Sequence, residues 1–198
     1  CLPKTAWPPT YLFRHKADST IFALLADSPN QLEDSRTVLA RMKEYHYHIN
    51  PDIYEAIIQL KEKAQYADLK AQPTQAKCNA YFKDFHNEYN YVEVAQIYNN
   101  LLYKAILNEP NDSTLRCYFN DTTLKTFYAN SKEPRPYLPE VQKLYDDCLF
   151  KAIQTATSSE AKKHSIKAYI GCPYLAGCNR RYLSQVEYAN DSIDLVIL

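Results

Sequence analysis

The sequence predicts an all-α protein, and three observations support this prediction. The chain has only two glycines in 198 residues, whereas tight turns between short strands often need glycine because it adopts positive φ without steric cost. Apolar residues recur at helical spacing in most segments that follow a proline or an asparagine. A fifteen-residue block also occurs twice, at residues 92–106 and 139–153, which is typical of a packing unit used twice.

The two blocks read VEVAQIYNNLLYKAI and PEVQKLYDDCLFKAI. The identical positions are Glu93/Glu140, Val94/Val141, Tyr98/Tyr145, Leu102/Leu149, Lys104/Lys151, Ala105/Ala152 and Ile106/Ile153. Similar residues occupy four further pairs of equivalent positions, namely Ile97/Leu144, Asn99/Asp146, Asn100/Asp147 and Tyr103/Phe150. A fainter similarity around Ile53 and Ile57 suggests a third copy. We therefore expect helical hairpins with an internal repeat, stapled by disulfides.

The N-terminal region is expected to hold an extended arm and two helices. Residues 1–18 combine prolines with the aromatic residues Trp7, Tyr11 and Phe13, which predicts an extended arm docked by its rings. Ser28-Pro29 and Asn50-Pro51 each place a capping residue before a proline at the first helical position. One helix is predicted after each pair.

A cysteine leads the next predicted helix. The residues Cys78, Tyr81, Phe82, Phe85 and Tyr89 fall on one helical face, and the first block follows directly. Farther along, Cys117, Leu124 and Tyr128 repeat the offsets of Cys78, Phe85 and Tyr89. We therefore equate Cys117 with Cys78, with a proline-bearing insert near residues 131–136 before the second block.

The C-terminal part is expected to hold one further helix and a mixed tail. Residues 158–170 form the helix, which Gly171 ends. The tail spans residues 172–198, and its last five residues fit either a short strand or a helix end. We divide the chain into an N-terminal arm and helices, residues 1–73, and a cysteine-bearing duplicated region of helical hairpins, residues 74–198. The alternative is one continuous domain.

Charge and hydropathy exclude two classes of partner. Lys and Arg number 23, as do Asp and Glu, so the basic surplus on which nucleic-acid binding depends is absent. No stretch approaches the roughly 18 apolar residues of a membrane helix. We expect neither nucleic acid nor a transmembrane segment.

No catalytic, cofactor or metal site is expected. Tyr45-His46-Tyr47-His48 resembles a metal ligand set, but histidines two apart point to different sides of a helix. The other histidines, His15, His86 and His164, are isolated. Phosphate-cradling glycine loops are excluded with two glycines. The adjacent acids Asp146-Asp147 and Glu33-Asp34 are expected to be solvated. We therefore expect no enzyme activity.

The cysteines are candidates for disulfide bonds. Six of them can form three disulfides, which would place the protein outside the cytosol. They are Cys1, Cys78, Cys117, Cys148, Cys172 and Cys178. The sequence does not choose among the fifteen possible pairings. A bond from Cys78 to Cys117 would join two hairpins. The alternative to disulfides is a set of buried thiols. Candidate N-glycosylation acceptors are Asn111, Asn120 and Asn190.

These residues resemble a known family. Cys78 with Tyr81, Cys117-Tyr118, and Cys172-x-Tyr174-x-x-x-Cys178 are similar to the paired Cys-Tyr-Cys motifs of the bicycle proteins of gall-forming aphids. The resemblance covers roughly residues 78–178. It implies a secreted salivary effector that enters plant tissue and binds a host macromolecule, without catalytic residues.

Our first hypothesis is therefore a secreted, non-catalytic helical protein that binds an unknown protein partner. One alternative is a carrier of a small apolar ligand, because apolar stripes with tyrosine tips can line a cavity between helices. Another is a bacterial lipoprotein, because lipobox processing leaves a cysteine such as Cys1 at the N-terminus.

Overall fold

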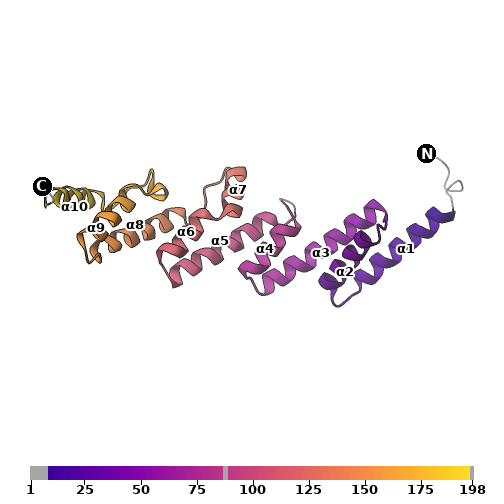
Figure 1. Ribbon diagram of the computed structural model, residues 1–198. Coiled ribbons are helices and arrows are strands. Elements are labelled where there is room, and N and C mark those ends of the chain that lie inside the picture. Colours follow the sequence, from indigo (N-terminus) through magenta and orange to yellow (C-terminus); the bar gives the residue numbers. More distant parts are fainter. Residues whose placement is uncertain (1–8, 87–88, 197–198) are drawn as a thin grey trace. The chain divides into compact units, whose positions relative to one another are not determined.

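The protein is all-α, as predicted. The computed structural model describes the backbone of residues 9–86 and 89–196, and the side chains of residues 16–86 and 89–192. These residues form ten α-helices and a 3-10 helix, with no strand among them (Figure 1). No helix in the described ranges is long and apolar enough to cross a membrane. The chain divides into two compact units, residues 1–94 and 95–198. Sequence placed the division after residue 73 instead.

The first unit contains four helices and the start of a fifth. They are α1 (Pro9–Ala26), α2 (Gln31–Glu44), α3 (Pro51–Ala71), α4 (Gln75–Asp84) and α5 (Tyr91–Asn108). The extended arm predicted for residues 1–18 is wrong over residues 9–18, which belong to α1. A proline is tolerated at a helix start because the N–H that it lacks would have no partner there. Residues 1–8 lie outside the described residues.

The two predicted helix starts differ in outcome. Asn50 caps α3, as predicted, and its side chain accepts hydrogen bonds from the backbone N–H of Asp52 and Ile53. Helix α2 was expected to begin at Pro29, but it begins two residues later, at Gln31, and Asn30 is its N-cap. Ser28 instead turns the chain, because its hydroxyl accepts from the Asn30 N–H at 2.9 Å and donates to the Asp34 carboxylate.

The helix predicted to carry the aromatic stripe from Cys78 to Tyr89 is shorter than expected. Helix α4 ends at Asp84, and Phe85 is its C-cap in an extended conformation. Tyr89 has a φ of 53° and is 40% exposed. A helical stripe therefore predicted the buried face correctly through Phe82, whereas Phe85 is buried from a position outside the helix.

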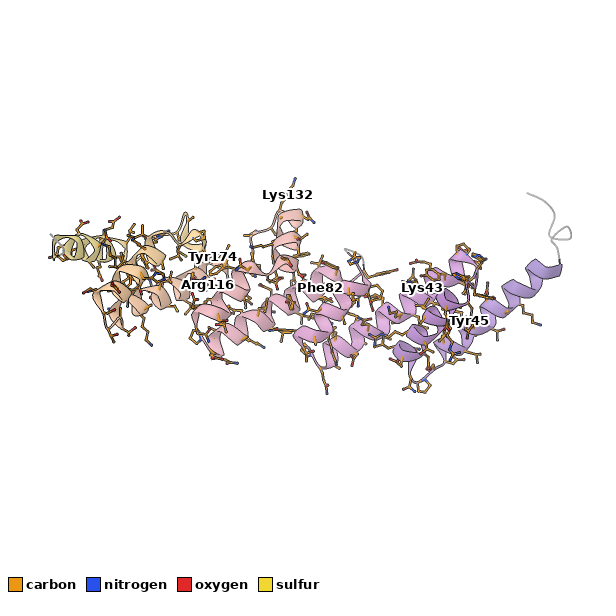
Figure 2. The ribbon with its side chains drawn as sticks, viewed as in Figure 1. Lys43, Tyr45, Phe82, Arg116, Lys132 and Tyr174 are labelled. Carbon is orange, nitrogen blue, oxygen red and sulfur yellow. The ribbon has the colours of Figure 1, made fainter. Side chains whose placement is uncertain are left out.

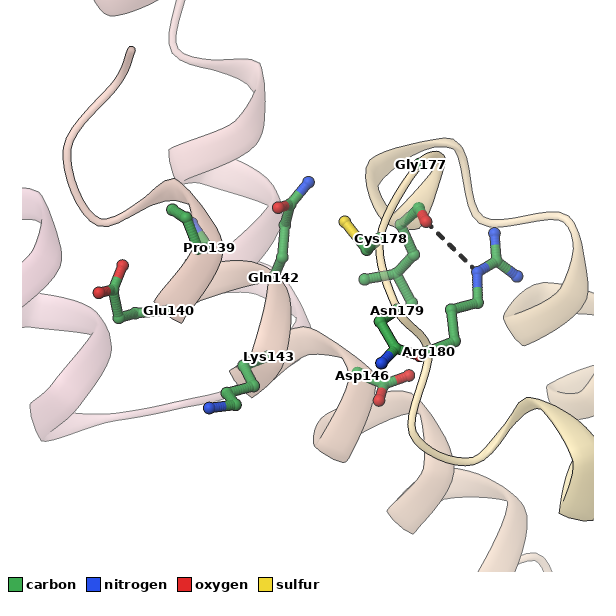
Figure 3. A pocket seen from close by; sticks show the side chains of 10 residues that line it. Pro139, Glu140, Gln142, Lys143, Asp146, Gly177, Cys178, Asn179 and Arg180 are labelled. Carbon is green, nitrogen blue, oxygen red and sulfur yellow. Dashed lines mark hydrogen bonds between the residues drawn. The ribbon is translucent and has the colours of Figure 1, made fainter.

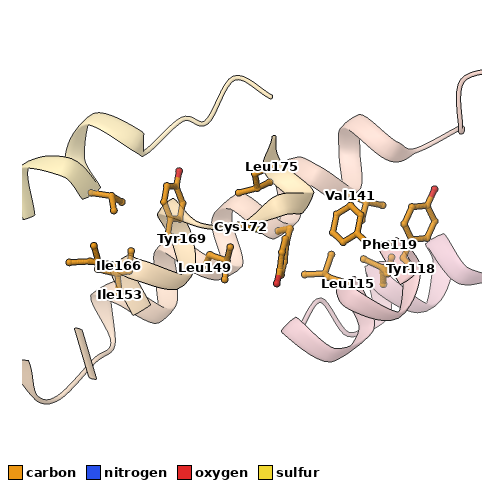
Figure 4. Packing of buried hydrophobic residues seen from close by; sticks show 13 residues of the cluster. Leu115, Tyr118, Phe119, Val141, Leu149, Ile153, Ile166, Tyr169, Cys172 and Leu175 are labelled. Carbon is orange, nitrogen blue, oxygen red and sulfur yellow. The ribbon is translucent and has the colours of Figure 1, made fainter. Parts of the chain in front are cut away.

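The second unit is built on one tyrosine-rich core. Its helices beyond α5 are α6 (Asp112–Asn120), α7 (Thr122–Ser131), α8 (Leu138–Gln154), α9 (Ser159–Ile170), η2 (Pro173–Leu175) and α10 (Leu183–Val196). The helix predicted over residues 158–170 is α9, which begins one residue later because Ser158 is its N-cap. Gly171 follows its last residue, as predicted, and is the C-cap with a φ of −82°. The tail predicted to be mixed consists mainly of α10. Of the two alternatives for the last five residues, a short strand or a helix end, the structure shows a helix through residue 196. Tyr118, Tyr145 and Tyr169 are almost fully buried in a core to which α5, α6, α8, α9, η2 and α10 contribute. Tyr118 and Tyr169 are labelled in Figure 4.

The correspondence proposed between Cys78 and Cys117 is wrong by two residues. Cys78 is fully buried, whereas Cys117 is exposed on α6. Leu115 occupies the buried position, three residues before Tyr118, as Cys78 lies three residues before Tyr81. The offsets misled because α6 ends at Asn120 and α7 begins as a separate helix, which Asp121 caps.

The cysteines of the described side chains are free thiols. Cys78 and Cys172 are buried, Cys148 and Cys178 are partly exposed, and Cys117 is exposed. The structure therefore contains none of the expected disulfides between these five residues, and it matches the alternative of buried thiols for Cys78 and Cys172. Cys1 lies outside the described residues.

The thiols should differ sharply in reactivity. Burial raises the pKa of the Cys78 thiol to about 11, and the thiolate is the nucleophile. We expect iodoacetamide at pH 8 to modify Cys117 first and Cys78 only after unfolding. Peptide mapping by mass spectrometry measures the order, and modification of Cys78 at the rate of Cys117 in the folded protein would contradict the burial described here.

Two of the candidate glycosylation acceptors already serve the fold. Asn111 caps α6 by accepting from the Thr114 N–H at 3.0 Å, and its amide donates to Glu109. The Asn120 side chain accepts from the Tyr174 hydroxyl at 2.9 Å. Asn190 is half-buried on α10. A glycan on Asn111 would attach to Nδ2, the atom that donates to Glu109, and would leave the Oδ1 that caps α6 in place.

Candidate functional site

Four long helices bury polar side chains that bond to other segments of the chain, and α3 also buries Gln65. Asp18 of α1, Glu62 of α3, Asn99 of α5 and Asp146 of α8 are between 1% and 5% exposed. A buried polar group is costly unless it is hydrogen-bonded. The expectation that Asp146 is solvated was therefore wrong. These four residues are therefore candidates for a functional site.

Asp18 and Asp146 are held in the same way. Asp18 accepts from the Tyr47 hydroxyl at 2.7 Å and from the Asn50 N–H at 2.9 Å. Asp146 accepts from the Tyr169 hydroxyl at 2.5 Å and from the Arg181 N–H at 3.0 Å. In both cases the carboxylate bonds one tyrosine and one backbone N–H, and that N–H belongs to the segment that precedes the next long helix. We call such an arrangement a clasp.

Glu62 and Asn99 form variants of the clasp. The Glu62 carboxylate accepts from the Tyr81 hydroxyl and from the Asn90 side-chain amide, and the Asn90 N–H donates to the same tyrosine oxygen. At Asn99 the acceptor is a backbone carbonyl. The Pro136 carbonyl accepts from Tyr118 at 2.6 Å and from the Asn99 amide at 3.3 Å.

A second contact recurs in the two blocks of the second unit. The Tyr137 ring stacks on Tyr103 with centroids 4.2 Å apart, and its hydroxyl donates to Asn100 at 2.8 Å. The Tyr182 ring stacks on Phe150 at 4.0 Å, and its hydroxyl donates to Asp147 at 2.8 Å. The similarity of the two blocks therefore has a physical cause, because matching positions make matching contacts.

The clasps satisfy most of their polar groups internally, and the exception among the described residues is the buried Oδ1 of Asn99, which has no hydrogen-bond partner. The clasps therefore serve the fold. The pKa values of the clasp tyrosines Tyr81, Tyr118 and Tyr169 are raised. Burial raises the pKa of Tyr118 to about 12. Burial first, and then the bonded carboxylate, raises the pKa of Tyr81 and of Tyr169. A tyrosine with a raised pKa keeps a proton that the unfolded chain releases.

This difference predicts alkaline destabilisation. Ordinary tyrosines lose their proton near pH 10, so between pH 10 and 12 the native state binds more protons than the unfolded state. The free energy of unfolding should therefore fall across this window and change little between pH 7 and 9. Urea unfolding at pH 7, 9 and 11 measures it, with tyrosinate absorbance as the second probe. An equal free energy at pH 9 and 11 would contradict the prediction.

The first unit has two neighbouring surface hollows around Tyr47. One, of about 290 Å³, is lined by Ile21, Val38, Arg41, Met42, Tyr45 and Tyr47. The other, of about 580 Å³, is lined by Arg36, Leu39, Ala40, Met42, Lys43, His46, Tyr47, His48, Ile49, Tyr54, Ile58 and Lys61. Met42 and Tyr47 line both. We call the two hollows together the Tyr47 surface. Figure 2 labels Lys43 and Tyr45, near the end of α2.

The Tyr47 surface contains Tyr45-His46-Tyr47-His48, the segment that resembles a metal ligand set in the sequence. His46 and His48 lie in the loop between α2 and α3, and His46 has a φ of 50°. No group of three potential ligands that could hold a metal ion occurs among the residues described by the structure. His86 and His164 are exposed elsewhere, and the side chain of His15 lies outside the described ones. The structure thus places this loop's rings at a hollow.

A further hollow of about 360 Å³ lies in the second unit, between α8 and the loop that follows η2 (Figure 3). Gln142, Lys143 and Asp146 line it from α8, with Cys178 and Arg180 opposite. Several of its polar groups are already engaged. The Arg180 guanidinium donates to the carbonyls of Tyr169, Ile170, Cys172 and Leu175, and Asp146 belongs to a clasp. The exposed Glu140 and Lys143, which also line the hollow, have opposite charges and do not select a ligand of either sign.

A scan against protein-family models, a search of curated proteins and a search of solved structures found no match to this chain.

Proposed function

We propose that the protein is a non-catalytic helical interaction protein that binds another protein through the Tyr47 surface. The supporting observation is the side-chain composition of that surface. Tyr45 is 67% exposed and Tyr54 is 45% exposed beside apolar hollows. Tyrosine and arginine are enriched at the energetic centres of protein interfaces. Secretion and an effector role, which the family resemblance implies, belong to the same proposal.

The clasps give this proposal a framework. In each clasp, hydrogen bonds join a buried polar side chain of a long helix, a tyrosine hydroxyl and the segment ahead of the next long helix. We therefore infer that the chain contains repeated helix pairs, of which the two sequence blocks are the most similar members. Proteins built from stacked repeats usually work by presenting side chains from rigid elements, and they seldom need a catalytic centre.

Site-specific photo-crosslinking tests the proposal. The photoreactive amino acid p-benzoylphenylalanine would replace Tyr45 in one protein and Tyr188 in another. Tyr188 is a matched control because it is 76% exposed and lies in the second unit. In extract of plant tissue, the host that the family resemblance implies, we expect discrete crosslinked species from position 45 and none from position 188. Equal crosslinking at both positions, or none at either, would overturn the proposal.

The second candidate is a carrier of a small apolar ligand, because apolar atoms dominate the smaller hollow. A ligand site normally encloses most of its ligand, whereas both hollows open to the surface. Solvent extraction of the purified protein followed by mass spectrometry distinguishes the candidates. A stoichiometric lipid in the extract would favour the carrier.

A further inference from the structure

The charged residues at the Tyr47 surface have one sign. Arg36, Arg41, Lys43 and Lys61 line the hollows, and no carboxylate lines either of them. Two of the cations are offset by acids farther away, because Lys61 pairs with Asp84 at 2.9 Å and Arg36 lies 3.7 Å from Glu33. Arg41 and Lys43 are exposed and form no ion pair with any residue that the structure describes. A local positive surplus therefore stands on a chain whose overall charge is balanced.

The apolar part of the surface lies between these cations. Met42 is buried at the base of both hollows, and Val38 and Leu39 pack in the same hydrophobic cluster. Tyrosine rings stand at the edges. A partner with acidic groups alone would leave these apolar walls in water, whereas an apolar partner would leave the cations without counter-charges.

The loop that carries Tyr47 is held before any partner arrives. The Tyr47 N–H donates to the Met42 carbonyl at 2.9 Å, and the His46 N–H donates to the Lys43 carbonyl at 3.3 Å. The Tyr47 hydroxyl is fixed on the buried Asp18. Binding to a loop that is already ordered loses less conformational entropy than binding to a mobile loop. The clasp at Asp18 therefore also positions the ring between the hollows.

We propose that the Tyr47 surface binds an acidic peptide segment of another protein, with apolar side chains of that segment in the two hollows and its carboxylates beside Arg41 and Lys43. This inference rests on the proposed function and adds the chemistry of the partner. Charge complementarity favours an acidic segment. The apolar hollows favour a peptide over a nucleic acid, whose binding depends mainly on phosphate contacts.

A random dodecapeptide library displayed on phage and selected on the intact protein tests this chemistry. We expect enriched peptides that combine Asp or Glu with Leu, Phe or Trp. Fluorescence anisotropy of a selected peptide would then compare two charge-reversed proteins. The R41E/K43E variant should bind it on the order of tenfold more weakly. The K104E/K125E variant carries the same change of charge at exposed lysines of the second unit and should bind it as the parent does. Circular dichroism checks that both variants fold.

The outcomes separate the two proposals. Enriched peptides without acidic residues that lose binding to Tyr54→Ser, but not to Tyr188→Ser, would leave the proposed function standing and overturn the acidic partner. The absence of any enriched peptide would overturn both. A single-stranded twenty-nucleotide DNA that binds more tightly than the selected peptides, and that R41E/K43E weakens, would replace the acidic peptide by nucleic acid.

Discussion

Replacing Asp146 by alanine is expected to lower the free energy of unfolding by about 2–6 kcal/mol, because two buried donors lose their acceptor. The substitution leaves the Tyr169 hydroxyl and the Arg181 N–H without their acceptor, and each unsatisfied buried donor costs about 1–3 kcal/mol. Arg181 also lies 3.7 Å from this carboxylate. Urea denaturation followed by far-ultraviolet circular dichroism measures the change.

The adjacent carboxylate is the matched control. The Asp147 side chain is 45% exposed and pairs with Arg181 at the surface, where such pairs contribute about 0–1 kcal/mol. Asp147→Ala also removes the acceptor of the partly buried Tyr182 hydroxyl, so it should cost about 1–2 kcal/mol. Tyr169→Phe should lose part of its cost in the Asp146→Ala background, because the two groups form one hydrogen bond. Equal effects of the two aspartate substitutions would contradict the clasp.

Leu115→Ala is the second substitution with a large expected effect. Leu115 is fully buried in the core of the second unit, and removal of a buried leucine side chain typically costs about 2–5 kcal/mol, including the cavity that it leaves. Cys117→Ala, two residues along the same helix, changes an exposed side chain and should alter the free energy of unfolding by no more than about 0.5 kcal/mol. The same urea titration measures both. A larger loss at Cys117 than at Leu115 would contradict the register of α6.

The two substitutions also show what sequence patterns could and could not predict. Helical periodicity, scarce glycine and the duplicated block predicted the fold class, because these signals are local. Asn50 caps the start of α3 and Gly171 follows the end of α9 as predicted, because capping depends on neighbours in sequence. The burial of Asp146 could not be predicted in this way. Its donors are 23 and 35 residues distant, and two adjacent acids ordinarily indicate a solvated helix face.

Register errors had a different cause. Cys117 repeated the offsets of Cys78 across a segment in which one helix ends and another begins, and a periodic pattern does not reveal such a break. A better signal was available in the pairs Tyr81-Phe82 and Tyr118-Phe119, which occupy matching buried positions. The Tyr47 surface was visible only in part. The motif of alternating tyrosines and histidines is visible in the sequence. The contribution of Met42 and Lys43 to this surface depends on the folded structure and is not.

The short range of the clasps has a consequence for how the molecule opens. Their hydrogen bonds join residues between 9 and 37 positions apart in the chain, and each clasp ties a long helix to the segment ahead of the next one. Contacts of this kind form early in folding, because closing short loops loses little chain entropy. Amide hydrogen exchange should therefore reveal several opening units of different free energy, each bounded by a clasp, and breaking one clasp should speed exchange most in the helices that it joins.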